Sequence, residues 1–453
     1  MSGQLGETSP ADIDALQRLN AELRACVDHD ALTGAWSRPF FENRVRELIA
    51  EDVPFAVMMI DVDNFKTVND TLGHSAGDDL LRRIAAHIMQ SLEHPGDGLA
   101  RIGGDEFAVI LKNCSSPDEA WRRAEPIHRS ASMQWTIDGC VVQNTCSCGV
   151  ALTSQDAGPD SLDALMRSAD LALYKAKSAG RDRCIVFTRK LNDEAERRRL
   201  VTRELQTALS YGDIGAALQG LFRMRGRSLS GFEALARWNH PRRGTVLPGE
   251  FISVARDARL LNEVTSAVLG ASLCELGPAL RSGLTLSVNI APVQLRSADL
   301  PQRLLDHLEL FDVSPTQIIV EITEVGLDSQ EALRSALSTM HDLVSMGCRL
   351  IIDDFGLGAA SLSYLRDYPV HGVKVSGDFT STLGDPFSHA ISASVAALGE
   401  QLGLHVIAER VETSMQFNML DRLGFSMIQG HLLHRPDTPA AAAALAQQEL
   451  VVI

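Results

Sequence analysis

The feature that most constrains this fold is a series of short apolar runs in the second half of the chain, each ended by a polar residue. Leu284–Val288 precedes Asn289, and Ile318–Val320 precedes Glu321, with helical patterns between the runs. Strands that alternate with helices over roughly 240 residues predict a (β/α)8 TIM-like barrel, whose functional groups lie at the carboxyl ends of its strands. Converging acids and an amide indicate a divalent-cation site for phosphate chemistry. The polar residues that end the runs are Glu233, Asn289, Glu321, Asp353 with Asp354, Lys374, Glu409 and Gln429.

The first half contains a glycine hairpin within Ala100–Leu111, whose sequence is ARIGGDEFAVIL. Gly103 and Gly104 supply the backbone freedom of a tight connection between two strands, and Asp105 and Glu106 follow at its exit. Two interpretations stay open from these residues alone. The segment is either a plain acidic turn or a site where carboxylates hold a hard divalent cation beside a closely approaching ligand.

A second acidic segment follows the apolar run Phe55–Ile60, which reads as a buried strand. Asp61, Val62 and Asp63 come directly after it, and a helix begins near Phe65. Ligands gather at the carboxyl ends of strands, where the free amides of a following helix also bind phosphate. Helix capping is the alternative, and it explains one acid better than two.

The length of 453 residues predicts two or three domains with large cores. Ser9–Cys26 has the spacing of an amphipathic helix, which either pairs with a partner's copy or packs on its own domain. We expect no room for a folded sensor domain ahead of it, so a separate sensor protein is an expected partner. The expected divisions are an N-terminal helix over 1–27, a first domain over 28–189, a charged helical linker over 190–209, a second domain over 210–440 and a tail over 441–453.

The charge balance excludes several classes of partner. The formal net charge of −16 argues against a nucleic-acid polymer or a membrane surface, which basic proteins bind. No run approaches the roughly 18 apolar residues of a membrane span, so we expect no membrane insertion and a cytoplasmic location. A phosphate ligand must therefore meet local cations, and one such cluster ends the helix Leu162–Lys177. It comprises Lys175, Lys177, Arg181 and Arg183, although such a cluster is usually only a solvated helix end.

Both halves resemble known families. Over roughly Asp28–Phe187 the chain resembles the GGDEF diguanylate cyclase domains through DHDALTG, MIDVDNFKTVNDTLGHSAGD, ARIGGDEF and YKAKSAGRDR. Over roughly Leu200–Pro436 it resembles the EAL cyclic-di-GMP phosphodiesterase domains through EALARW, SVNIAPVQL, EITE, DDFG, AERVE and IQG. The resemblance implies an α/β protein of two domains, a nucleotide-cyclase-like α+β domain with a ferredoxin-like core and then the barrel.

The cyclase resemblance implies a role for each matching residue. Asp61, the carbonyl of Val62 and Asp105 would hold Mg²⁺, or Mn²⁺, on the triphosphate of GTP, and Asp105 and Glu106 are the catalytic candidates. Each domain of this family holds one GTP, so two domains must face each other and a homodimer is expected. The residues implied in substrate binding are Asn69 and Asp78 at the guanine and Lys66, Lys177 and Arg181 at phosphates.

The phosphodiesterase resemblance implies a two-metal site that hydrolyses cyclic di-GMP to pGpG. Lys374 would orient the attacking water or stabilise charge, and Glu324 would hold the loop after Asp354. Gln219, Arg237 and Gln429 would contact the dinucleotide. The implied ligands are Glu233, Asn289, Glu321 and Asp353 around one ion, and Asp353, Asp354 and Glu409 around the other.

Several positions depart from the family patterns. Product-inhibited cyclases carry Arg-x-x-Asp where this chain has His94 to Asp97, so we expect weak or absent feedback inhibition. The family's Lys-Ile-Asp ends here in Ser376, although Asp378 follows two residues later and is a candidate to face the same way. The remaining departures are Leu357 and Ala359 after DDFG and Gly220 in place of a proline.

These features predict a bifunctional enzyme that makes cyclic di-GMP from two GTP molecules and hydrolyses it. The alternative is a cyclase or receptor whose EAL half binds cyclic di-GMP without efficient hydrolysis, and Ser376 keeps that alternative open. A third interpretation, in which GTP in the first half only regulates the second, conflicts with the intact Asp61 and Asp105.

Overall fold

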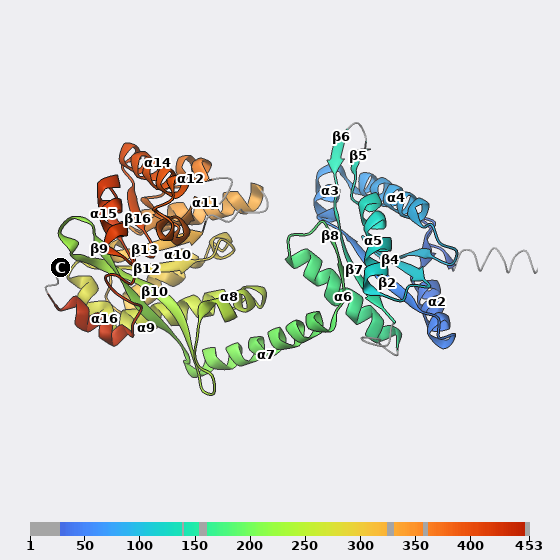
Figure 1. Cartoon of the computed structure of the whole chain (residues 1–453), viewed down its shortest axis with the longest axis horizontal. Helices are drawn as coiled ribbons and strands as arrows, with labels where there is room; N and C mark the ends of the chain where they lie inside the picture. Colours follow the sequence, from blue (N-terminus) through green and yellow to red (C-terminus); the bar gives the residue numbers. More distant parts are fainter. Residues whose placement is uncertain (1–27, 138–139, 154–160, 324–329, 357–360, 449–453) are drawn as a thin grey trace, which may run out of the picture. The chain divides into compact units, whose positions relative to one another are not determined.

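The computed structural model describes residues 28–137, 140–153, 161–323, 330–356 and 361–448. The chain divides into two compact units at Arg197 and Arg198, inside helix α7 (Arg189–Tyr211) (Figure 1). Each unit is considered by itself. The helix expected over Ser9–Cys26 lies outside the described residues.

The first unit is built on a six-stranded sheet with the order β1-β3-β4-β2-β7-β8. Its centre is the apolar β2 (Phe55–Val62), which is antiparallel to both neighbours and almost wholly buried. The other strands are β1 (Trp36–Ser37), β3 (Gly98–Gly103), β4 (Glu106–Lys112), β7 (Cys146–Leu152) and β8 (Arg183–Val186). A separate hairpin pairs β5 (Gln134–Ile137) with β6 (Cys140–Gln143).

Helices cover both faces of this sheet, because its side chains alternate between two apolar cores. One core packs α3, α4 and α5, and the other packs α2 and α6 (Figure 1). The bounds are α2 (Arg38–Ala50), α3 (Phe65–Leu72), α4 (His74–Ser91), α5 (Pro117–Ala131) and α6 (Leu162–Ser178). This arrangement confirms the expected α+β domain.

The second unit is a closed barrel of eight strands, which confirms the expected architecture with one difference. Strand β9 is antiparallel to both of its neighbours, whereas the other neighbouring pairs of the barrel are parallel. Only residues 224–228 join β9 to β10, and so short a connection cannot make the crossover of a parallel pair. The barrel strands are β9 (Ile214–Arg223), β10 (Leu229–His240), β12 (Thr285–Ile290), β13 (Ile318–Thr323), β14 (Arg349–Phe355), β15 (Gly372–Val375), β16 (His405–Ala408) and β17 (Met427–Ile428).

The outer side chains of the barrel pack against a ring of helices in one large core (Figure 1). A separate buried cluster fills the interior and consists of Leu221, Ile319, Ile351, Ile407 and Met427. A short strand β11 (Gly244–Val246) extends the sheet beyond β10. The helices are α8 (Pro248–Asp257), α9 (Leu261–Arg281), α10 (Leu300–Leu310), α11 (Gln330–Ser345), α12 (Ser361–Asp367), α13 (Gly377–Ser381), α14 (Pro386–Leu402), α15 (Ser414–Leu423) and α16 (Pro439–Ala446), with three short 3-10 turns, η1 (Arg225–Arg227), η2 (Gln294–Arg296) and η3 (Pro315–Gln317).

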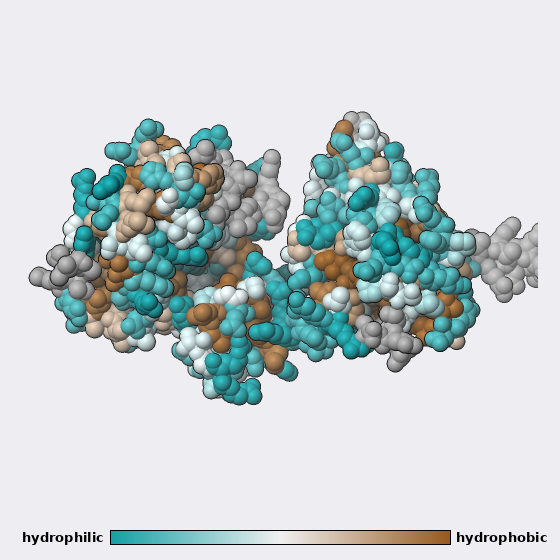
Figure 2. All heavy atoms as spheres, in the orientation of Figure 1, coloured by the Kyte–Doolittle hydropathy of each residue, from teal (hydrophilic) through white to brown (hydrophobic). Residues whose placement is uncertain are grey.

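The surface of each unit is mostly hydrophilic on the face shown in Figure 2, and its apolar residues form separate patches. Among the described helices, none is both long enough and apolar enough to cross a membrane.

Candidate active sites

The mouth of the barrel collects the polar residues predicted at the strand ends. Strand side chains alternate between faces, so a residue two positions from a member of the buried interior cluster also faces the barrel interior. Glu321, for example, follows Ile319 by two positions, and Asp353 follows Ile351 by two. Strands β13 and β14 run past their acids, to Thr323 and Phe355, whereas β16 and β17 end directly before Glu409 and Gln429. The side chains joined here by direct contacts are Gln219, Glu233, Asn289, Glu321, Asp353, Lys374, Glu409 and Gln429.

Lys374 lies at the centre of this group, and its side chain is only 1% exposed. Its Nζ is 2.7 Å from Glu409 Oε1, 2.9 Å from Glu321 Oε2 and 3.1 Å from Glu233 Oε2. The Oδ1 atom of Asp353 is farther away, at 3.6 Å. Four strands thus direct carboxylates at one buried ammonium group.

Glu233 is held by amides as well as by the lysine. Asn289 Nδ2 donates to Oε1 of Glu233 at 2.7 Å, and Gln429 Nε2 donates to its Oε2 at 2.7 Å. Gln429 Nε2 also lies 3.1 Å from Gln219 Oε1, whose own amide donates to the carbonyl of His434. These bonds fix the orientation of the Glu233 carboxylate.

The pKa values in this cluster reflect the burial of several carboxylates around a single lysine. Burial raises the pKa of Glu409 to about 7, although Lys374 opposes the rise. Burial and Glu233 hold the pKa of Glu321 well above its usual range. Burial would also raise the pKa of Glu233, but Lys374 and the two amides outweigh it and keep that pKa low. The pKa of Lys374 is held well above normal because the surrounding carboxylates outweigh its burial.

The residue types at the mouth fit a hard divalent cation. Carboxylate and amide oxygens are the ligands that Mg²⁺ and Mn²⁺ prefer, and Asp353 Oδ1 is buried without a hydrogen-bond partner. In their present conformations, no three His, Cys, Asp or Glu side chains of the described residues are arranged to hold a metal ion. The ammonium of Lys374 stands among the carboxylates instead, so metal binding requires some of these side chains to turn away from it.

A cavity of about 430 Å³ opens above this cluster. Asp354 and Arg410 line it with backbone φ angles of 52°, a left-handed conformation that non-glycine residues adopt at a cost. Arg237 lies four residues beyond Glu233 on β10, and its guanidinium donates to the carbonyl of Ala236. The described lining residues are Gln219, Glu233, Leu235, Asp353, Asp354, Glu409, Arg410, Glu412, Gln429, Gly430 and His431.

The departures from the family pattern have different structural outcomes. Asp378 does not face the carboxylate cluster, because its side chain is 66% exposed and pairs with Arg410 at 3.2 Å. Ser376 is buried and caps α13. At Gly220 the backbone N–H donates to Nδ1 of His434, a bond that a proline could not make. Glu324, Leu357 and Ala359 lie outside the described residues.

The candidate site of the first unit surrounds the glycine hairpin. Asp61 on β2 lies directly opposite Glu106 on β4, and the backbone N–H of Val62 donates to the carbonyl of Asp105. The Oδ2 atom of Asp61 is 2.6 Å from Nζ of Lys177 at the end of α6. The structure therefore brings together the strand-end acid, the hairpin acids and one distant cation.

The electrostatics of this hairpin site favour a cation. Burial raises the pKa of Asp61, with smaller contributions from Asp105 and Asp63 against the effect of Lys177. Burial, Asp61 and Asp105 likewise raise the pKa of Glu106. A hard divalent ion at these oxygens would relieve that repulsion, so the donor set fits Mg²⁺ here too.

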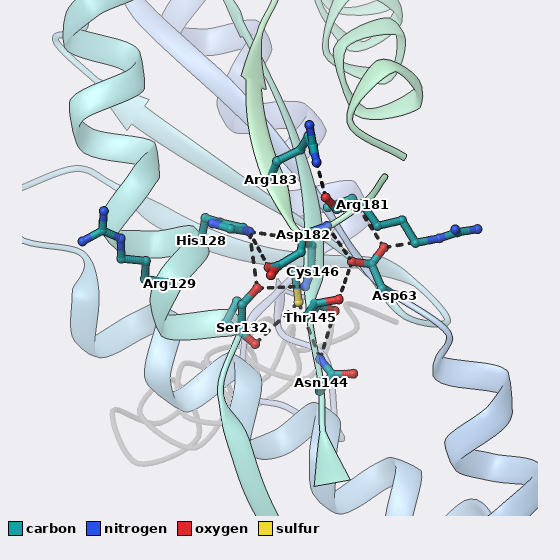
Figure 3. Close-up of polar contacts among 12 residues, drawn as sticks. Asp63, His128, Arg129, Ser132, Asn144, Thr145, Cys146, Arg181, Asp182 and Arg183 are labelled. Atoms are coloured by element: carbon teal, nitrogen blue, oxygen red, sulfur yellow. Dashed lines mark hydrogen bonds and ion pairs between the residues drawn. The ribbon is translucent and has the colours of Figure 1, made fainter. Parts of the chain in front are cut away.

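Asp63 holds the turn after α6 rather than capping α3, whose N-cap is Asn64 (Figure 3). Its carboxylate accepts hydrogen bonds from the Thr145 and Ser147 hydroxyls, both at 2.8 Å, and from the Asp182 backbone N–H at 3.2 Å. Arg181 lies 3.9 Å from Asp63 Oδ1. Arg181 and Asp182 have φ angles of 62° and 45°, so these contacts stabilise a backbone that would otherwise relax.

Fewer contacts fix the remaining predicted residues of the first unit. Lys66 on α3 and Asp78 on α4 are exposed, and Asn69 is half-buried between these helices. Gly77 makes room for Asn69, because a Cβ atom at Gly77 would lie 2.0 Å from Asn69 Oδ1. Among the described residues, no hydrogen bond or ion pair joins these three side chains to the hairpin.

Arg123 on α5 was not among the predicted site residues, and its guanidinium forms an ion pair with Asp97. Its Nη2 lies 2.7 and 2.8 Å from the two carboxylate oxygens of Asp97, which also accepts from the backbone N–H of Lys112. Both side chains are largely buried. Nothing in the local sequence signals this pair, since the two residues are far apart in the chain.

Comparison with known proteins gives the class that this fold and these sites define. The family model described as diguanylate cyclase, GGDEF domain, matches residues 27–183, and the model described as EAL domain matches residues 202–436. The second match covers more than half of the chain, which therefore belongs to the EAL family and carries a GGDEF domain ahead of its barrel.

Several relatives share both domains. The chain is 33% identical over 433 residues to the bifunctional diguanylate cyclase/cyclic di-GMP phosphodiesterase MucR of Pseudomonas aeruginosa, covering 93% of this chain and 62% of that protein. It is also 33% identical over 440 residues to the cyclic di-GMP phosphodiesterase PdeR of Escherichia coli, covering 96% and 65%. The chain thus spans about half to two thirds of the length of such relatives.

Two solved structures are similar in fold. The MucR phosphodiesterase in complex with cyclic di-GMP has 31% identity and a TM-score of 0.50, covering 54% of this chain and 99% of that chain. The S helix-GGDEF-EAL part of Vibrio cholerae LapD bound to cyclic di-GMP has a TM-score of 0.54 over 93% of this chain and all of that chain. Its 19% identity supports the shared fold alone.

Proposed function

We propose that this protein is a bifunctional enzyme of cyclic-di-GMP turnover. The GGDEF half condenses two GTP molecules to cyclic di-GMP, and the EAL half hydrolyses cyclic di-GMP to pGpG. The observation that carries this proposal is the convergence of Glu233, Glu321, Asp353 and Glu409 on one buried lysine at the barrel mouth, together with the acidic hairpin site in the same chain. The similarity to MucR supports it.

In the EAL half, Glu233, Asn289, Glu321 and Asp353 would hold one divalent ion, and Asp353, Asp354 and Glu409 a second. Ions held there would supply an activated water and offset charge on the phosphate. Gln429 and Asn289 orient Glu233, so the carboxylate is placed before substrate arrives. Lys374 remains protonated among the acids and stabilises negative charge on the scissile phosphate. Gln219 and Arg237 would contact the dinucleotide.

In the GGDEF half, Asp61, the Val62 carbonyl and Asp105 would hold Mg²⁺ at the triphosphate of GTP. The attacking group is a 3′-hydroxyl, so an acceptor for its proton is needed, and Glu106 with its raised pKa suits that role. Lys66, Lys177 and Arg181 would meet phosphates, while Asn69 and Asp78 would bind the guanine edge. Each domain presents one set of these residues, so synthesis requires two copies of the chain, in the cytoplasm where GTP is supplied.

A product assay tests both activities. Purified protein is given GTP with Mg²⁺, and separately cyclic di-GMP with Mg²⁺, and the products are identified by chromatography. Wild type should form cyclic di-GMP and pGpG, Asp105→Ala should lose only synthesis, and Glu233→Ala only hydrolysis. The exposed acids Asp118 and Glu275 provide matched Ala controls. Cyclic di-GMP that accumulates without any pGpG would reject the bifunctional proposal.

That outcome would favour a second candidate, in which the EAL half binds cyclic di-GMP without efficient hydrolysis. One observation supports this candidate. Ser376 lacks the family carboxylate, and Asp378 does not replace it, because its side chain pairs with Arg410 at the surface. Retained binding of cyclic di-GMP in Glu233→Gln and wild type alike, with no turnover, would establish a receptor.

A further inference from the structure

The interior of the barrel is layered by charge. The apolar cluster around Ile351 separates the acidic mouth from the opposite end of the strands. Arg349 and His405 each lie two residues ahead of a member of that cluster, and Arg223 lies two residues beyond one on the antiparallel β9. By the alternation of strand side chains, all three face the barrel interior at the end away from the carboxylates. His371 directly precedes β15 at the same end.

The two arginines of this cationic end have no acceptor among the described residues. Within the described parts of the chain, no side-chain hydrogen bond or ion pair involves the guanidinium of Arg223 or Arg349. Burial and the nearby Arg223 lower the pKa of Arg349, which is half-buried. Burial and Arg349 also lower the pKa of both His371 and His405. The charge of Arg349 therefore disfavours a positive charge on each of the two histidines.

The segments that lead directly into the strands at this end carry little acid to offset them. Asp and Glu are absent from the segments that lead into the strands at this end, namely 224–228, 282–284, 346–348, 369–371, 403–404 and 424–426, and β13 has Asp312 six residues ahead of it. Arg225 and Arg227 add further positive charge in η1. In a chain with a formal net charge of −16, this concentration of cations is a local exception.

We propose that Arg223, Arg349, His371 and His405 form a binding site for a phosphate dianion, either inorganic phosphate or the phosphate group of a small ester. Two guanidinium groups match two negative charges, and their planar forks suit the oxygens of a phosphate. The Nδ1 atom of His371 accepts from the backbone N–H of Leu350, which leaves its Nε2 as a donor. The site lies at the far end of the barrel from the catalytic residues, so it does not rest on the proposed enzymatic function.

Isothermal titration calorimetry with the full chain tests this site. EDTA excludes binding through metals, and the combined changes Lys66→Gln, Lys177→Gln and Arg181→Gln remove the candidate phosphate contacts of the first unit. At constant ionic strength, inorganic phosphate should bind with a stoichiometry of one, and acetate should not. Glycerol 3-phosphate distinguishes the sources, because tighter binding than phosphate indicates an ester and weaker binding indicates the free ion.

Variants of the two arginines decide the outcome. Arg349→Gln and Arg223→Gln should each weaken phosphate binding by about tenfold or more, and Arg349→Lys, which keeps the charge but loses the fork, should have an intermediate effect. The control is Arg242→Gln, a surface arginine of the same unit that pairs with Glu204. Thermal unfolding confirms that each variant is folded. Equal affinity in Arg349→Gln, Arg223→Gln and Arg242→Gln would mean an adventitious ion only, and no saturable binding in the parent protein would also overturn the proposal.

Discussion

The barrel mouth and the glycine hairpin carry the same kind of side chain in different surroundings. At the mouth, acids from several strands surround a buried lysine, and amides fix the orientation of Glu233. At the hairpin, Asp105 and Glu106 are more open, and Lys177 pairs with Asp61. The contacts at the mouth all come from one unit of one chain, whereas the synthesis proposed for the hairpin would need a second copy of the chain.

Lys374→Met, at the barrel mouth, should have the largest effect on activity. It leaves the acids without their ammonium, so we expect cyclic-di-GMP hydrolysis to fall by about 100-fold or more. Synthesis by the other unit should be unchanged, as measured by cyclic di-GMP formed from GTP. Lys190→Met, an exposed lysine of α7, is the matched control. Hydrolysis at the wild-type rate in Lys374→Met would contradict a central role for this residue.

Asp63→Ala should weaken GTP binding at the hairpin site of the first unit. The turn with Arg181 loses its carboxylate support, so we expect the KM for GTP to rise about tenfold with a smaller change in kcat. Steady-state kinetics of cyclic di-GMP synthesis measure the two constants. Asp79→Ala, which removes an exposed pair with Arg83, serves as the control. A fall in kcat with an unchanged KM would argue against a role in positioning Arg181.

The pH dependence of the unfolding free energy should show the effect of burying acids at the barrel mouth. In EDTA, the folded state holds the pKa of Glu409 at about 7, above its ordinary value of 4.5, so folding favours the protonated acid. The unfolding free energy should therefore fall as pH rises from about 5 through 7, by up to roughly 3 kcal/mol. Urea titrations measure this slope. Glu409→Gln should flatten it, and an identical slope in that variant would show that other groups control the dependence.

His94→Arg should have the smallest effect. It restores the arginine of the product-binding pattern, but Arg123 already holds Asp97 with two short contacts, so added cyclic di-GMP should still not inhibit synthesis. Initial rates with and without added product measure this. The double variant His94→Arg with Arg123→Gln frees Asp97, and inhibition should appear there. Strong inhibition of the wild type would refute the expectation.

Much of this protein can be predicted from its sequence, because local patterns reflect local physics. Apolar runs ended by polar residues predicted the barrel and named the acids of its mouth, since barrel strands are apolar along their packed length and carry functional groups at their carboxyl ends. The glycines of the hairpin predicted its turn, where Gly104 has a positive φ angle. The roles of these residues in catalysis remain proposals.

Tertiary structure alone decided how these residues are used. The sequence could not show that Asp378 pairs with Arg410, that Arg123 occupies Asp97, or that Asp63 supports the turn at Arg181. Nor could it show that Arg223, on an antiparallel strand, lies at the same end of the barrel as Arg349 and lowers its pKa. Such pairs join residues far apart in the chain, so their geometry depends on strand order and direction, which no local pattern encodes. The acidic hairpin, the carboxylates of the barrel mouth and the lysines Lys177 and Lys374 could be named from the sequence, while the pairs that they form depend on the fold.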